Sequence, residues 1–446
     1  MTTRKCFAVF DGDTHVVEPR ELWETYLEPE YRVLGKSALW REEGKLGSYL
    51  KVNGEMFRDT DNMNIPRHAI WRPGMTWDAI GDLDPQTRHA MNEGAWNPQA
   101  RLRDMDAMGV DQAFLYPTWF AEGFPLVKDP DVAYALARAY NNWIADCCKA
   151  APDRLFAAAM LPLQHMEFAL EELQRVAKIP CFRGAFIRPI FVEGRYLTHP
   201  YYEPLWAELT AMGMTAAVHA TPGLHNPEWT SHGPFIEKVK GRLTQTSLLG
   251  DVGGGPFAGG GGSAFTITGV PLGHALSPIL AYWLDNYLFV ASTLLGYGVM
   301  HRYPTLKVVV AHGKATWMEE VLEKFEASTR VIALQHYYPV RTDAEEMWEE
   351  GHVMLGFDAD ERGVCKLPER YSAKVIWGSR YPHDDTTSAW GAMQMLTQAH
   401  VEESVIARMM GGNAAHQFGI PLVQTVGASP GSYSSGGRGV QEAGGR

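Results

Sequence analysis

Three short segments of the chain place an acid or a histidine where an apolar run ends. FDGDTH brings Asp13 and His15 two positions apart, AAVH ends at His219, and VVVAH ends at His312. In an extended segment, side chains two positions apart project to the same face. One carboxylate and several imidazoles that converge could hold a divalent metal ion or transfer protons. Asp-x-His alone is weak evidence, because it can be an ordered turn and a lone histidine can be a core residue.

Whether these side chains meet depends on the strands that carry them. Short apolar runs predict eight strands, at 7–11, 112–117, 155–162, 183–189, 214–219, 306–312, 352–358 and 373–379. Uninterrupted apolar runs are typical of parallel strands that are covered on both faces. Helical patterns alternate with them, at 101–110, 129–154, 166–178, 201–213, 278–302 and 316–328. The alternation predicts an α/β fold, a distorted (β/α)8 TIM-type barrel, whose strands all end at one shared mouth.

Three segments do not fit the alternation. Residues 20–99 are predicted to form an inserted lid after the first strand, and 222–277 a Gly-rich loop insertion. The low-complexity stretch 424–446 is predicted to be a disordered tail, so the barrel with its insertions occupies 1–423.

Composition narrows the partners and the compartment. The net charge of −12 argues against nucleic acid and anionic membranes as partners, which leaves a small-molecule substrate. The start lacks the apolar core of a signal peptide, and the apolar run at 278–302 is interrupted by Asp285 and Asn286. Five cysteines without Cys-x-x-Cys spacing fit a reducing compartment. We therefore expect a cytoplasmic protein.

Over nearly its whole length the chain resembles the amidohydrolase-related proteins of the amino-carboxymuconate-semialdehyde decarboxylase type, within the metal-dependent amidohydrolase superfamily. The motifs that carry the resemblance run from 7 to 420: DGDTHVVEP, RLRDMDAMGVD, AYALARAYNNWIADCCKAAPDRLFAAAMLPL, FRGAFIRP, HPYYEPLWAEL, AAVHA, YPTLKVVVAHGKATWMEEVLEKFE, GSRYPH and GNAAHQFGI. The resemblance implies the same distorted barrel, and relatives are often dimers, so a homodimer is expected.

The resemblance also implies roles for particular residues. Asp13, His15 and His219 match metal ligands, and His312 matches a histidine that acts as an acid/base or electrophile beside the metal. One or two divalent ions are expected; zinc or iron suits two histidines and one carboxylate, and manganese is compatible.

Arg380, in GSRYPH, departs from the family pattern, because relatives carry an aspartate there that binds metal and handles a proton. A guanidinium can do neither. At about 4 Å from a divalent ion it would be repelled by several kcal/mol at an effective dielectric constant near 20. We expect Arg380 to turn away from the metal and clamp a substrate carboxylate or a developing oxyanion.

Other residues could complete the site. Candidates to replace the missing carboxylate are Asp384, Asp385, Glu18 and Asp358, with Glu361 as a further one; the alternative for each is a solvated loop charge. Candidates for contacting the substrate are Arg188, Trp119, Phe120 and His383; the alternatives are a structural ion pair for the arginine and ordinary packing for the aromatic residues.

Three functions compete. The favoured hypothesis is a hydrolase of the amidase, esterase or thioesterase type, in which metal-activated water attacks an amide, ester or acyl-thioester carbonyl of a small or medium-sized carboxylated metabolite. The alternative is a metal-dependent, non-oxidative decarboxylase (a carboxy-lyase) of an aromatic or unsaturated acid, in which His312 protonates the carbanion. A second alternative is a relative that binds a ligand without metal, having lost the eighth-strand aspartate to Arg380.

Overall fold

A barrel of eight parallel strands forms the centre of the computed structural model, which describes residues 5–44, 47–59, 67–76, 83, 90–220, 284–331 and 341–424. Its strands follow one another around the sheet in chain order: β1 (Phe10–His15), β5 (Gln112–Tyr116), β6 (Leu155–Ala159), β7 (Phe182–Ile187), β8 (Thr215–His219), β9 (Val308–Ala311), β10 (Val353–Phe357) and β11 (Val375–Trp377). Almost every strand residue is buried, as expected for strands covered by helices outside and packed side chains inside. The predicted distorted (β/α)8 barrel is confirmed.

The first strand differs from the prediction in position. It was expected at 7–11, but β1 extends from Phe10 to His15, so Asp13 and His15 lie within the strand. Its pairing with β5 shifts register between Asp11 and Thr14. Polar residues at the end of a buried strand obscured this boundary in the sequence.

The barrel closes through the segment that follows β11. The backbone N–H of Arg380 donates to the carbonyl of Asp13 (2.8 Å), and the N–H of His15 donates to the carbonyl of Tyr381 (2.7 Å). The carboxylate of Asp11 accepts the backbone N–H of Ser379 at 2.9 Å and also its hydroxyl. The first and last strands are therefore joined at the level of the candidate site.

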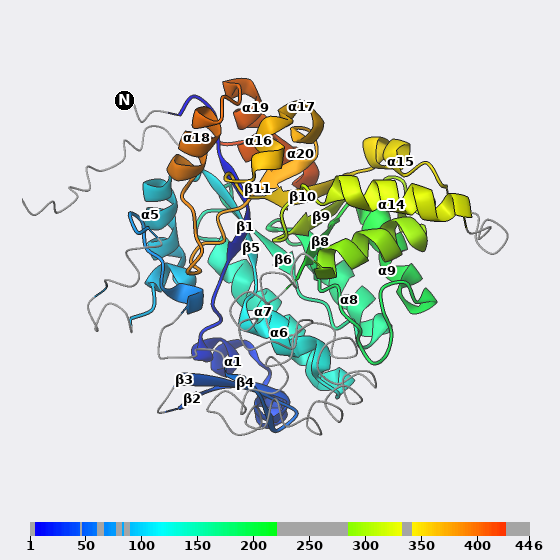
Figure 1. Ribbon diagram of the computed structural model, residues 1–446. Helices are drawn as coiled ribbons and strands as arrows, with labels where there is room; N and C mark the ends of the chain where they lie inside the picture. Colours follow the sequence, from blue (N-terminus) through cyan, green and yellow to red (C-terminus); the bar gives the residue numbers. More distant parts are fainter. Residues whose placement is uncertain are drawn as a thin grey trace, which may run out of the picture.

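Helices surround the barrel (Figure 1). They are α5 (Pro98–Met108), α6 (Trp119–Gly123), α7 (Pro130–Cys148), α8 (Met166–Val176), α9 (Glu203–Met212), α13 (Val299–Arg302), α14 (Met318–Val331), α15 (Ala344–Glu350), α16 (Arg362–Lys366), α17 (Pro368–Tyr371), α18 (Ala389–Gln398), α19 (Glu403–Ala407) and α20 (Asn413–Phe418). Local signals set several ends: the side chain of Asn97 caps α5, and that of Asp129 caps α7. A π-helix, η10 (Arg408–Gly412), lies between α19 and α20.

The segment after β1 builds a small subdomain where a lid was predicted. It contains α1 (Arg20–Tyr26), α2 (Arg32–Ala38) and an antiparallel sheet of β2 (Leu39–Gly44), β3 (Gly47–Val52) and β4 (Glu55–Asp59). This sheet lies beyond the end of β1, beside α1 (Figure 1). Side chains of Leu39, Leu50 and Val52 lie so close to Gly123 of α6 that a β-carbon there would clash. The antiparallel sheet was not predicted.

Two predicted segments, the Gly-rich insertion 222–277 and the tail from 425 onward, lie outside the residues that the structure describes. Among the residues that are described, no helix is long and apolar enough to cross a membrane.

Adjacent glycines in η10 give a matched test of packing against the segment that leads into β1. A β-carbon on Gly411 would lie 2.3 Å from the backbone oxygen of Ala8, whereas one on Gly412 would meet ordinary contacts at 3.9 Å or more. We expect Gly411→Ala to lower the free energy of unfolding by about 1–3 kcal/mol, because backbone cannot move away as a flexible side chain can. Gly412→Ala, the control, should be neutral or slightly stabilising. Urea denaturation measures both, and equal midpoints would contradict the packing.

Candidate metal centre

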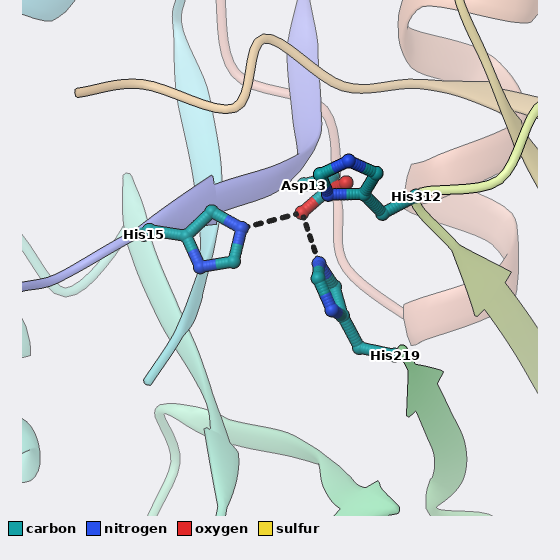
Figure 2. Close-up of side chains that lie close together, drawn as sticks. All are labelled: Asp13, His15, His219 and His312. Carbon is teal, nitrogen blue, oxygen red and sulfur yellow. Dashed lines mark ion pairs between the residues drawn. The ribbon is translucent and has the colours of Figure 1, made fainter. Parts of the chain in front are cut away.

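Four side chains converge at the ends of three strands (Figure 2). Asp13 and His15 come from β1, His219 ends β8, and His312 follows β9. Each contributes one potential ligand atom, and these atoms all lie within 4.8 Å of one another. The Nε2 atoms of His15 and His219 lie 3.2 and 3.3 Å from Oδ1 of Asp13. The residues singled out from three distant parts of the sequence are thus brought together.

The atoms that face one another in this group are short of ordinary partners. Oδ1 of Asp13 and Nε2 of His15 and of His219 are buried, and within the described part of the chain none makes a hydrogen bond of normal geometry. Leaving such atoms unsatisfied costs about 1–3 kcal/mol each. A divalent cation would satisfy all three at once, and a carboxylate with two imidazoles is a donor set that suits zinc, iron or manganese. The residues present therefore fit a metal ion.

Backbone carbonyls orient the two imidazoles. Nδ1 of His15 lies 3.2 Å from the carbonyl oxygen of Pro117, and Nδ1 of His219 lies 2.5 Å from that of Ala220. Donation from each Nδ1–H leaves Nε2 as the basic nitrogen, directed toward Asp13. Burial alone would raise the pKa of Asp13, but His219 and His15 hold it well below its usual value.

Arg101 braces the same strand from outside the cluster. Its buried guanidinium donates to the hydroxyl of Thr14 (3.0 Å) and to the carbonyl of His15, and it lies over the ring of Tyr381. The RLRDMD motif thus supplies a positioning residue that sequence reasoning did not single out.

His312 occupies an unusual backbone position. Its φ of 51° lies in the left-handed region, and its carbonyl accepts a hydrogen bond from the Asn286 amide at 3.0 Å. Its ring contacts that of His219 edge to face, with centroids 5.2 Å apart. Burial, and then the positive charge of Arg380, lowers its pKa well below the usual value. The imidazole is therefore neutral near pH 7, which permits metal binding or proton transfer.

Arg380 lies beside the cluster with its charge compensated. Its guanidinium forms ion pairs with Asp358 and with Asp385, the latter through Nε at 2.7 Å. Burial opposes its charge, but Asp385 and Asp358 raise the pKa above the ordinary value, so the group stays protonated. Two of the proposed replacement carboxylates are therefore partners of Arg380. The expectation that Arg380 clamps a substrate stays a prediction.

The other proposed replacement ligands lie outside the group of four. Glu18 accepts the backbone N–H groups of Thr118 (2.8 Å) and Trp119 (3.0 Å) at the start of α6. Glu361 likewise accepts the N–H groups of Ala315 and Thr316 (2.7 and 2.8 Å). Both carboxylates hold the backbone of loops that follow barrel strands. Asp384, next to Asp385, also lies outside the group.

The predicted substrate contacts divide into two sets. His383 stacks on His15 with ring centroids 4.2 Å apart, and its Nε2 lies 3.3 Å from the Thr118 hydroxyl. His68, which sequence reasoning missed, contacts the His383 ring at 5.2 Å. Only the fold reveals His68, because its segment carries no recognisable motif.

The second set is Arg188, Trp119 and Phe120, which are bound to or line the region around α6. Arg188 donates to the carbonyls of Ala121 (3.3 Å) and Glu122, and so supports α6. Trp119 and Phe120 line a cavity under the inserted sheet, and the four residues of the cluster do not contribute to its lining. A contact between these three residues and the substrate remains a prediction.

With this geometry in place, comparison with known proteins identifies the family. A family model described as Amidohydrolase matches residues 11–420. The chain belongs to the amidohydrolase family. The predicted resemblance is confirmed, because the relatives include enzymes of the branch that was named.

Two relatives illustrate that branch. Over 124 residues the chain is 34% identical to gamma-resorcylate decarboxylase of Rhizobium sp. (strain MTP-10005), which covers 27% of this chain and 37% of the relative. It is 22% identical over 342 residues to 2-amino-3-carboxymuconate-6-semialdehyde decarboxylase of Dictyostelium discoideum, covering 76% of this chain and 81% of the relative. The matched part thus spans well under two thirds of the Rhizobium enzyme.

Solved structures share the fold. An amidohydrolase from Mycobacterium avium subsp. paratuberculosis matches with a TM-score of 0.67 at 18% identity, over 93% of this chain and all of that one. A dihydroxybenzoic acid decarboxylase from Polaromonas sp. JS666, solved with manganese and 2-nitroresorcinol, matches with a TM-score of 0.56 at 15% identity, over 93% and 97% of the two chains. At these identities the likeness shows the barrel alone.

The comparisons overturn the favoured hypothesis of a hydrolase. The relatives that match by sequence are decarboxylases, and decarboxylases recur among the matched structures. The error has a physical origin: a metal beside an imidazole serves hydrolysis and decarboxylation equally well, so the residue pattern alone could not separate them.

Metal analysis tests the centre directly. We expect His219→Ala, in protein purified without a histidine tag, to hold less than about a tenth of the metal bound by the unmodified chain, since each ligand contributes several kcal/mol. His301→Ala is the matched control, because His301 is exposed on α13. Plasma emission spectrometry measures the content, and full retention of metal in His219→Ala would remove this residue from the ligand set.

Proposed function

We propose that the protein is a metal-dependent, non-oxidative decarboxylase of a small aromatic or unsaturated carboxylic acid. The observation that carries the proposal is the convergence of Asp13, His15, His219 and His312 in a chain whose relatives are decarboxylases. A bound divalent ion would supply Lewis acidity at the substrate's oxygen atoms. The relative solved with manganese supports manganese as the ion alongside zinc and iron.

The chain's own residues would divide the work. Asp13, His15 and His219 would hold the ion, and the carbonyls of Pro117 and Ala220 fix the two imidazoles. When the bond between the carboxyl group and the substrate carbon breaks, carbon dioxide leaves and its electron pair stays on that carbon. Because its pKa is depressed, the His312 imidazole is neutral at rest, so it would first take up a proton from solvent or from the substrate and then pass that proton to the carbon, which returns it to the neutral form.

Arg380 would serve the substrate through its guanidinium. Its positive charge lowers the pKa of His312 and in turn is stabilised by Asp13, so it acts on the centre itself. Asp358 and Asp385 hold the guanidinium in place and compensate its charge. Its role toward a substrate carboxylate would therefore be donation of N–H groups at short range. The homodimer and the cytoplasmic location remain predictions.

Product analysis tests the reaction class. The metal-loaded protein should release carbon dioxide from members of a panel of hydroxybenzoic acids and unsaturated carboxylic acids, and the metal-stripped protein should not. Matched aryl esters, amides and acyl thioesters should yield no free acid above background. Gas-phase mass spectrometry and liquid chromatography follow the two products. Acid release without carbon dioxide would contradict the proposal.

Removing the proton donor should separate chemistry from metal binding. We expect His312→Ala to lower kcat by about 100-fold or more, as general acids contribute on that order, while it retains most of the bound metal. Steady-state kinetics and metal analysis on the same samples measure both. Loss of metal together with activity would make His312 a ligand and not the donor.

Arg380→Ala tests the carboxylate-binding role. We expect it to keep the metal and to lower kcat/KM by about tenfold or more, because a charge-assisted contact is worth roughly 1.5–3 kcal/mol. Arg103→Ala, on the exposed face of α5, is the control. If Arg380→Ala strips the metal or leaves kcat/KM unchanged, Arg380 has a different role.

A further inference from the structure

The backbone directly after β9 adopts an uncommon conformation. His312 has a φ of 51° and Lys314 a φ of 65°, both in the left-handed region. Residues other than glycine adopt this region rarely, because their β-carbon crowds the following carbonyl oxygen. Such residues keep the conformation where surrounding contacts hold them, and they cluster at functional sites. The contacts that hold the backbone of His312 therefore also decide where its imidazole lies.

The side chain of Asn286 supplies two of these contacts. Asn286 is fully buried, in the helical turn that leads into the π-helix η8 (Phe289–Gly296). Its Nδ2 donates to the carbonyl of Ala311 and to that of His312, in both cases at 3.0 Å. An amide nitrogen carries two N–H groups, so both can be used at once. The two acceptors stand on either side of the His312 residue, and Asn286 therefore holds its backbone before and after the side chain.

Gly313 makes this close approach possible. A β-carbon on Gly313 would lie 2.2 Å from Nδ2 of Asn286, far inside van der Waals contact. The φ of Gly313 lies outside the left-handed region, so the nearness of Asn286, and not the backbone conformation, requires a glycine here. Asn286 and the segment that contains His312 and Gly313 are thus fitted to one another, although Asn286 and His312 are 26 residues apart.

Other contacts hold the backbone on both sides of this point. Beyond it, the carboxylate of Glu361 accepts two backbone N–H groups of the loop, and Nε1 of Trp317 donates to two of its carbonyls at 2.8 Å. Before it, Ala311 ends β9, which pairs with β8. Between these two anchored stretches, the hydrogen bonds from Asn286 reach the backbone of His312 itself.

We propose that Asn286 is a positioning residue that sets the direction of the His312 imidazole at the metal centre. Its two hydrogen bonds keep His312 in the left-handed conformation, in which the ring lies beside Asp13 and His219 (Figure 2). Without them the backbone can relax to a negative φ, where the side chain leaves the chain in another direction. A displacement of about 1 Å can lower a rate by about 100-fold. For the reaction the inference rests on the proposed function, and for the geometry of His312 it does not.

Gln417 provides a matched control on the same strand. Its Nε2 donates to the carbonyls of Val308 (3.0 Å) and His352 (2.8 Å), where β9 begins, so the same kind of double hydrogen bond acts at the opposite end. Asn286→Leu and Gln417→Met each remove two such bonds with little change in volume. Both should lower the midpoint of thermal unfolding, because buried carbonyls lose their donors. A purely structural role for Asn286 predicts that the two variants also behave alike in every other measurement.

Nuclear magnetic resonance of protein labelled with [13Cε1]-histidine reads the surroundings of His312 without metal or substrate. At pH 8 the His312 signal, identified by its absence in His312→Ala, should shift in Asn286→Leu and stay in place in Gln417→Met. Asn286→Ser is the milder second variant: its hydroxyl offers one donor, so the signal should shift in the same direction by less. The inference is overturned if the signal stays in place in both Asn286 variants, or if Gln417→Met moves it as far.

Kinetics of the metal-loaded variants test the consequence for the reaction. Asn286→Leu should lower kcat by about tenfold or more while KM and the bound metal change little, and Gln417→Met should keep the kcat of the unmodified protein. An unchanged kcat in Asn286→Leu would overturn the positioning role. If the unmodified protein releases no carbon dioxide, the proposed function fails, whereas the His312 signal still decides whether Asn286 holds this histidine.

Discussion

The candidate centre depends on the joint between the first and last strands of the barrel. Hydrogen bonds from Arg380 to Asp13 and from His15 to Tyr381 close the ring at the point where two potential ligands leave β1. Arg101 braces the same stretch through Thr14 and the carbonyl of His15. A shift of one residue in β1 would turn Asp13 and His15 away from His219, because side chains alternate along a strand. The hydrogen bonds that close the barrel therefore also fix the positions of Asp13 and His15.

This joint also explains how an arginine is tolerated beside a metal centre. The backbone of Arg380 has a φ of 61° and takes part in closing the barrel, so its position is set by main-chain bonds. Its side chain is held by Asp358 and Asp385, which follow β10 and β11. An unpaired buried guanidinium would be strongly unfavourable, whereas one with two carboxylates is stable. The position where the family resemblance predicts an aspartate thus holds a compensated cation, which lies outside the group of four potential ligands.

The inserted subdomain is attached to the barrel through α6. Its sheet packs on α6 through Leu39, Leu50 and Val52 around Gly123, and Glu18 anchors the start of that helix. The insertion is therefore connected to the loop after β1, which begins directly after His15, and to the loop after β5, which carries Thr118. Three tryptophans line the cavity beneath the sheet, together with basic and acidic side chains.

The sequence by itself determined the barrel and the four residues at its centre. Uninterrupted apolar runs such as TAAV and VVVA predict parallel strands that are covered on both faces. The histidine that comes directly after each run then lies at the barrel mouth, where all the strands end. The reaction class was not determined in this way, because one donor set serves several chemistries; relatives decided against hydrolysis. Only the tertiary structure decided the partners of Arg380, the bracing by Arg101, the place of His68 and the cavity under the insertion. Each of these joins segments far apart in the chain, such as Arg101 with His15 or Trp119 with Arg41, and spacing along a sequence carries no record of such contacts.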